Sequence, residues 1–148
     1  MTQKRRSLVK LRDARSRLRD LEAARTAEAA AHCDAQEQVL AVANRDLVSA
    51  VQRACEQLAQ ARQVSDVEAA HLHVDAARDF VTDATQSVKA AAESRRAAAS
   101  ILNQRERELR GTERALEVVT SAEKREVERR EQVMVDDLVG SRMSRRDV

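Results

Sequence analysis

The chain contains no proline, and its two glycines, Gly111 and Gly140, both lie in the C-terminal third. Proline and glycine are the residues that interrupt helices most strongly, so nothing before Gly111 stops a helix by intrinsic preference. Any earlier turn must therefore be specified by other residues. The absence of helix breakers predicts long, continuous helices.

Aromatic residues are nearly absent as well, because Phe80 is the sole aromatic in 148 residues, whereas charged residues make up 35%. A compact core normally uses several aromatic side chains, but alanine, leucine, arginine and glutamate suit a narrow contact between helices. A net charge of only +2 argues against disorder. The composition predicts an all-α fold, a long antiparallel two-helix coiled-coil hairpin that forms a single domain over residues 1–148.

The sequence also lacks segments for membrane insertion or export. No apolar run approaches the roughly 20 residues that span a bilayer, and the N-terminus has no apolar signal-peptide region. Cys33 and Cys55 lie 22 residues apart, which is about 33 Å on one helix and too far for a disulfide. Unpaired cysteines suit a reducing compartment, so we expect a soluble, cytoplasmic protein.

Apolar residues recur at heptad spacing in both halves of the chain, symmetrically about residue 65. The predicted contact positions in the first half are Leu11, Ala14, Leu18, Leu21, Arg25, Glu28, His32, Ala35, Val39 and Val42. Those in the second half are Val88, Ala91, Arg95, Ala98, Leu102, Arg105, Leu109, Thr112, Leu116 and Val119. Between residues 46 and 58 the spacing slips, which predicts a discontinuity in the heptads.

The turn is expected at Ser65, since a serine followed by Glu68 three residues later matches a capping box. This places helix 1 at about 4–63, the turn near 64–66, helix 2 at about 66–138 and a frayed tail at 139–148.

No constellation of residues in the sequence indicates catalysis. His71 and His73 do not share a helix face and match no common zinc spacing, and there is no phosphate-binding loop or nucleophile motif. We therefore expect no enzyme activity, cofactor, metal or small-molecule substrate. Residues 1–25 carry a net charge of +6, but no aromatics are interleaved for base stacking, so nucleic-acid binding is not favoured.

The C-terminal part combines charge with apolar residues. A dense charge run over residues 123–131 precedes Val133, Met134, Val135 and Leu138. In the mirrored pairing, little of helix 1 remains to cover these apolar residues. The pattern predicts a docking end, in which apolar groups are surrounded by charge.

Two segments resemble a known family. Residues 8–15, Leu-Val-Lys-Leu-Arg-Asp-Ala-Arg, resemble the N-terminal Leu-x-x-Leu-Arg stretch of the FliJ/YscO stalk proteins of type III secretion. Residues 124–138 are similar to the Arg/Glu-rich C-terminal segment of that family, which ends in an acidic and apolar pair. The high alanine content resembles the plant-pathogen or rhizobial branch.

The resemblance implies a non-enzymatic stalk. Its terminal end would dock into the hexameric secretion ATPase and couple it to the export-gate membrane protein, and some members also hold substrate chaperones. The stalk would then be cytoplasmic and peripheral to the inner membrane through its partners. The partner-binding residues carried over to this chain are Leu8, Arg12, Arg15, Lys124, Arg125, Arg129, Arg130, Val133, Met134 and Leu138.

Two other functions are compatible with the same residues. The first is a self-associating helical scaffold or granule coat of the phasin type, which the alanine-rich contact would suit. The second is a coiled coil associated with nucleic acid through its basic N-terminus. Pairing of two hairpins into a homodimer is left open by the sequence.

Overall fold

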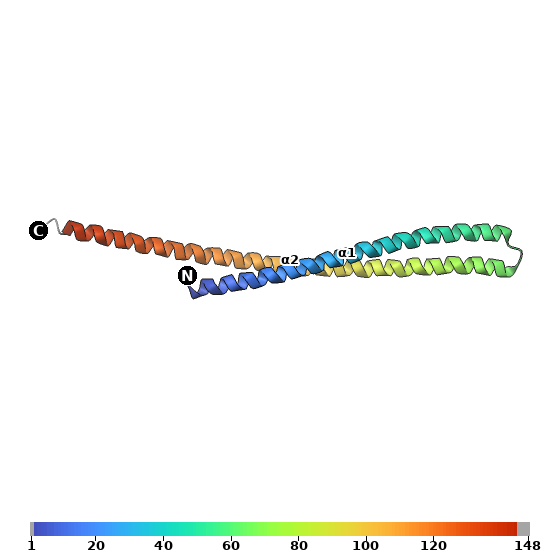
Figure 1. Ribbon diagram of the computed structural model, residues 1–148, viewed down its shortest axis with the longest axis horizontal. Helices are drawn as coiled ribbons and strands as arrows, with labels where there is room; N and C mark the ends of the chain where they lie inside the picture. Colours follow the sequence, from blue (N-terminus) through green and yellow to red (C-terminus); the bar gives the residue numbers. More distant parts are fainter. Residues whose placement is uncertain (1, 145–148) are drawn as a thin grey trace. The chain divides into compact units, whose positions relative to one another are not determined.

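The computed structural model describes residues 2–144, and it confirms the predicted hairpin of two long helices (Figure 1). Helix α1 spans Gln3–Gln60 and helix α2 spans Val64–Ser144, and the two run antiparallel. The chain divides into two compact units: unit 1 comprises Met1–Asp20 with Asn103–Val148, and unit 2 comprises Leu21–Leu102. The two units are described separately below.

The turn lies at residues 61–63, earlier than predicted, and the expected Ser65 cap is wrong. Ser65 lies inside the first turn of α2. The Asp66 carboxylate instead accepts hydrogen bonds from the backbone N–H groups of Arg62 and Gln63, each at 3.1 Å. An acidic side chain that reaches back from the first turn in this way satisfies amides that would otherwise lack a partner. One carboxylate, rather than a glycine or proline, therefore closes the hairpin.

The core of unit 2 is thin and made mostly of alanine. Its buried apolar residues, each at most 7% exposed, are Cys33, Ala43, Ala50, Ala54, Ala70, Ala84 and Ala91. Larger apolar side chains such as Leu40, Leu47, Val74 and Val81 are half-buried beside them. Small buried side chains let two helix backbones approach closely, so the contact relies on proximity rather than on large core residues.

The contact stripe of α2 follows the predicted positions. Of the ten, nine are buried or half-buried, and Arg95 is the exception. The stripe continues to the turn without a break through Val88, Ala84, Val81, Ala77, Val74, Ala70 and Val67. The leucines and valines of this stripe form the contact of α2, whereas Leu72, Phe80, Ile101 and Val118 lie outside it and are exposed.

The contact stripe of α1 lies one residue later than predicted, so the predicted positions are wrong. All ten predicted positions, from Leu11 to Val42, are exposed. The buried and half-buried positions one residue later are Arg12, Arg15, Arg19, Glu22, Thr26, Ala29, Cys33, Gln36, Leu40 and Ala43, and Ser16, Ala23 and Ala30 beside them are half-buried as well. A shift of one residue turns a helix by about 100°, which carries Leu11, Leu18 and Leu21 from the contact to its flank.

Residues 26–54 explain this choice. In the observed stripe this stretch carries no charge and continues through Leu47, Ala50 and Ala54. The predicted stripe would have brought Arg25 and Glu28 into the contact, where unpaired charges are costly. The expected slip between residues 46 and 58 is therefore also wrong: Leu47 and Ala54 belong to heptads that are continuous from the start of α1.

Both ends of α2 differ from the prediction. The helix begins at Val64 and continues to Ser144, so residues 139–144 of the expected frayed tail are helical. Residues 145–148 lie outside the described residues. The helix also continues through Gly111, where an added Cβ atom would meet nothing within 4 Å. A single glycine costs about 1 kcal/mol relative to alanine, which a helix of this length tolerates.

The one-residue shift can be tested at two adjacent positions in unit 2. Ala43 is 0% exposed and Val42 is 44% exposed. We expect Ala43→Leu to lower the free energy of unfolding by about 1–3 kcal/mol, because it overpacks the contact. Val42→Leu should change it by less than about 0.5 kcal/mol. Urea denaturation followed by circular dichroism measures both, and equal effects would contradict the observed stripe.

The capping role of Asp66 gives a second test. Asp66→Ala removes the acceptor for two loop amides, and we expect a loss of about 1 kcal/mol in unfolding free energy. Ser65→Ala is the matched control, because the Ser65 hydroxyl contacts only the Gln63 side chain, at 3.5 Å. Thermal melts that show the larger loss for Ser65→Ala would restore the original capping prediction.

Candidate partner-binding segment

The start of α1 is held against α2 by a cluster around Glu123 in unit 1. One Glu123 oxygen accepts hydrogen bonds from the Thr2 backbone N–H, at 3.0 Å, and from the Thr2 hydroxyl. The other lies 3.4 Å from the Arg5 guanidinium. These bonds, the Thr2 hydroxyl bond first, hold the pKa of the Glu123 carboxyl below its ordinary value. Glu123 therefore marks the point on α2 where the described part of α1 begins.

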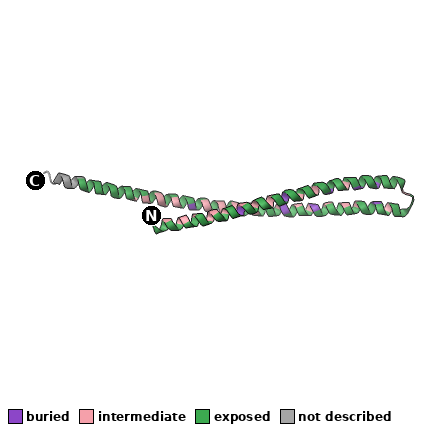
Figure 2. Cartoon of the chain, in the orientation of Figure 1, coloured by how far each residue is buried: buried purple, intermediate pink, exposed green. Residues whose placement is uncertain are grey.

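Helix α2 continues past this point, and each residue from 127 to 138 is exposed (Figure 2). We call residues 124–138 the C-terminal segment. Its large apolar side chains are between 54% and 66% exposed, and they are Val127, Val133, Met134, Val135 and Leu138. The predicted apolar residues of the docking end, Val133, Met134 and Leu138, thus lie together on an exposed stretch of helix. Val127 belongs with them, although sequence reasoning placed it within the charge run.

The charges of the C-terminal segment are arranged in pairs along the helix. The Glu126 carboxylate accepts hydrogen bonds from the guanidinium groups of Arg129, at 3.2 Å, and Arg130, at 3.0 Å. These bonds lower the pKa of the Glu126 carboxyl. Lys124 lies 3.8 Å from Glu128. Glu126, Arg129, Arg130 and Val133 line a depression on the helix surface. The arginines are about three-quarters exposed, so their outer N–H groups face solvent beside the apolar residues.

The three predicted site residues from α1 lie elsewhere, within the helix contact of unit 1. Leu8, Arg12 and Arg15 are half-buried. The Arg15 guanidinium donates hydrogen bonds to the Glu108 backbone carbonyl, at 2.8 Å, and to the Thr112 hydroxyl, at 2.5 Å. Arg12 pairs with its neighbour Asp13 at 2.7 Å. Arg15 therefore bonds α1 to α2, and Leu8 and Arg12 lie half-buried on the same stripe, whereas residues 127–138 of the C-terminal segment are open to solvent.

Sequence reasoning missed a periodic row of arginines in the contact of unit 1. Arg5, Arg12 and Arg19 recur every seven residues on the contact stripe of α1. The Nε atoms of Arg5 and Arg19 are buried without a hydrogen-bond partner among the described residues. An unsatisfied buried donor costs about 1–3 kcal/mol, although the aliphatic part of arginine still packs favourably. The heptad spacing of these arginines was the signal that could have located the contact.

The described residues contain no group of three or more metal-ligating side chains. Within the same part of the chain, neither helix has a stretch long and apolar enough to cross a membrane. Comparison with protein families, curated proteins and solved structures found no match to this chain. The exposed C-terminal segment is therefore the strongest candidate site in unit 1, on geometry alone.

The Glu123 cluster gives a prediction about pH. Because the folded-state pKa of Glu123 lies below 4.5, the contact is fully formed above that pH and is lost as pH falls through the lowered value. In a carboxyl ¹³C NMR titration, we expect the pKa of Glu123 to lie below the ordinary value of a glutamate, and Thr2→Ala to move its midpoint upward. An unmoved Glu123 midpoint in Thr2→Ala would show that the cluster does not form.

Proposed function

We propose that the chain is a non-enzymatic coiled-coil stalk of a type III secretion apparatus. The proposal combines the hairpin fold with the resemblance of residues 8–15 and 124–138 to the FliJ/YscO family. In this role the C-terminal segment docks into the hexameric secretion ATPase, and the hairpin couples that ATPase to the export-gate membrane protein. Substrate chaperones are a further class of partner that the resemblance implies.

The observation that carries the proposal is the exposed C-terminal segment. Five large apolar side chains within twelve residues lie more than half exposed, and such a concentration on one short stretch marks an interaction surface. An amphipathic helix of this kind binds by placing its apolar residues in a groove of the partner. Arg129 and Arg130 beside them suit an acidic rim on that groove, since arginine pairs readily with carboxylates.

The position of Arg15 refines the proposal. Because Arg15 is bonded to Glu108 and Thr112 inside unit 1, its expected role is to hold the base of the hairpin rather than to contact the ATPase. Leu8 and Arg12 share this role through their half-buried positions. The proposed contact with the ATPase therefore depends on Lys124, Arg125, Arg129, Arg130, Val133, Met134 and Leu138.

Titration calorimetry with the type III secretion ATPase of the same organism tests this function. We expect the chain to bind the ATPase and to stimulate ATP hydrolysis, and Met134→Asp to weaken binding by about tenfold or more, because a charge replaces an apolar contact. Val118→Asp is the matched control, since Val118 is 69% exposed and Met134 is 66% exposed. Val118 lies outside the C-terminal segment, so its substitution should change affinity less than about twofold.

Two results would reject the proposal. One is that the purified chain neither binds nor stimulates the ATPase, and the other is that deletion of its gene leaves secretion intact. Equal losses for Val118→Asp and Met134→Asp would show that binding does not use the C-terminal segment.

A further inference from the structure

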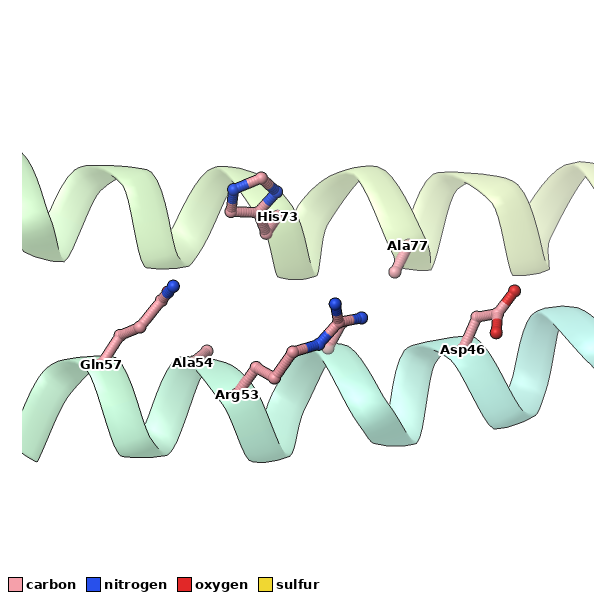
Figure 3. Close-up of a pocket in the computed structure, with 7 residues that line it drawn as sticks. Asp46, Arg53, Ala54, Gln57, His73 and Ala77 are labelled. Carbon is pink, nitrogen blue, oxygen red and sulfur yellow. The ribbon is translucent and has the colours of Figure 1, made fainter.

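Unit 2 has two sides with different chemistry, and two grooves show which positions share a side. One groove is lined by Asp46 and Arg53 of α1 and by His73 of α2 (Figure 3). The other is lined by Glu37 of α1 and by Arg95 and Arg96 of α2. Each side of unit 2 therefore contains residues of both helices. Positions seven residues apart along a helix lie on the same side.

The side that contains Asp46, Arg53 and His73 is also apolar along much of its length. Val39, Phe80 and Ile101 lie at heptad steps from those groove residues, and Leu21 and Val42 lie four residues before such positions on the same side of α1. All five side chains are between 40% and 49% exposed. We call this the apolar side of unit 2. Small residues of α2 on the same side, Ala90, Ser94 and Ala97, are exposed as well, and small side chains allow another helix to approach closely.

We propose that the apolar side of unit 2 binds a second copy of this chain, with the two hairpins antiparallel. This inference does not depend on the proposed function, because it concerns a different unit and a different surface. The order of side chains along α1 supports a second, antiparallel copy of the chain as the partner that covers this face.

Along α1, the residues on the apolar side are arranged symmetrically. From Leu21 to Val39 they are Leu21, Arg25, Glu28, His32, Ala35 and Val39. A two-fold axis between Glu28 and His32 places Leu21 opposite the partner's Val39, Arg25 opposite the partner's Ala35, and Glu28 opposite the partner's His32. Arg25 is exposed, so its aliphatic part can pack on the alanine while its guanidinium stays in solvent. Each pairing then occurs twice, as a two-fold interface requires. The apolar pairs lie at both ends, and in the centre the Glu28 carboxylate accepts a hydrogen bond from an imidazole N–H.

A parallel arrangement of the two hairpins fits less well. It would place α1 of one copy against α2 of the other at the same level along the hairpin. The ion pair between Asp34 and Arg95, at 3.9 Å, fixes which levels coincide. Ile101 would then lie level with the partner's Glu28, and Asp83 would lie level with the partner's Asp46, which has the same charge. Burying apolar residues against unpaired charges is unfavourable, so the antiparallel arrangement is preferred.

The size of the face sets the expected strength. Residues 21–39 span about 27 Å, and two helices together are roughly 20 Å wide, which gives about 500 Å² for each copy. Stable specific interfaces bury about 800 Å² for each partner. We therefore expect a reversible dimer with a dissociation constant in the micromolar range, seen as a concentration-dependent mass in sedimentation equilibrium.

Disulfide trapping tests the arrangement directly. In a background with Cys33→Ala and Cys55→Ala, Leu21→Cys and Val39→Cys are made as separate proteins. We expect mild oxidation of an equimolar mixture to give a crosslinked dimer of the two variants. Each variant alone should give little crosslink. In a dimer of one variant, the thiols of the two copies would lie about 27 Å apart along the helices, too far for a disulfide. Crosslinking of each variant alone, to the same extent as the mixture, would overturn the antiparallel arrangement.

Matched charge insertions test the face itself. Val39 is 40% exposed on the apolar side, and Val51 is 41% exposed elsewhere on α1. We expect Val39→Asp to raise the dimer dissociation constant by about tenfold or more, and Val51→Asp to change it by less than about twofold. Glu28→Lys should weaken the dimer, and the double variant Glu28→Lys with His32→Glu should restore it, because the pair is exchanged in both copies.

Three results would overturn the proposal. The first is a monomer at all concentrations up to a few hundred micromolar, which would assign the face to another partner. The second is a greater loss for Val51→Asp than for Val39→Asp. The third is a failure of the exchanged charge pair to restore dimerisation when circular dichroism shows that both variants are folded.

Discussion

A continuous helix can present only one heptad phase to its partner, and this constraint decides which residues of α1 are buried. Residues 11–21 favour one stripe, through Leu11, Leu18 and Leu21, and residues 26–54 favour the stripe one residue later. No proline or glycine in α1 changes the phase. The contact therefore follows the stripe that residues 26–54 favour, which is longer and has no charged residue at its contact positions. Three leucines then lie on the flank, and arginines occupy the contact positions of unit 1.

Much of the fold could be predicted because the sequence leaves few alternatives. The scarcity of helix breakers predicts two long helices, and nine of the ten heptad positions predicted on α2 lie in the contact. The phase of α1 could not be predicted from its leucines, because two stripes compete there. The mirror symmetry about residue 65 placed the turn within a few residues of its position at 61–63, but it did not show which side chain caps α2. Asp66 determines the turn through bonds to loop amides, and spacing alone does not reveal such bonds.

The candidate site was predictable to the extent that it depends on α2 alone. The C-terminal segment lies past the start of α1 in any pairing near the one observed, so its exposure follows from counting residues. The burial of Leu8, Arg12 and Arg15 depends on the phase of α1, so their half-buried positions could not be predicted while that phase was one residue out. In unit 1 the arginine stems pack while their charged ends reach outward or bond to Glu108, Thr112 and Glu123. A contact built this way gains less per residue than the alanine and leucine contact of unit 2.

The two cysteines, which lie on the same helix of unit 2, have opposite environments. Cys33 is 2% exposed in the contact with α2, and Cys55 is exposed. A thiol reagent can reach Cys55 in the folded hairpin, but it reaches Cys33 only when the helices separate around it. The unmodified protein therefore carries its own reporter of hairpin opening. The modification rate of Cys33, measured relative to that of Cys55, gives the frequency with which the narrow alanine core comes apart.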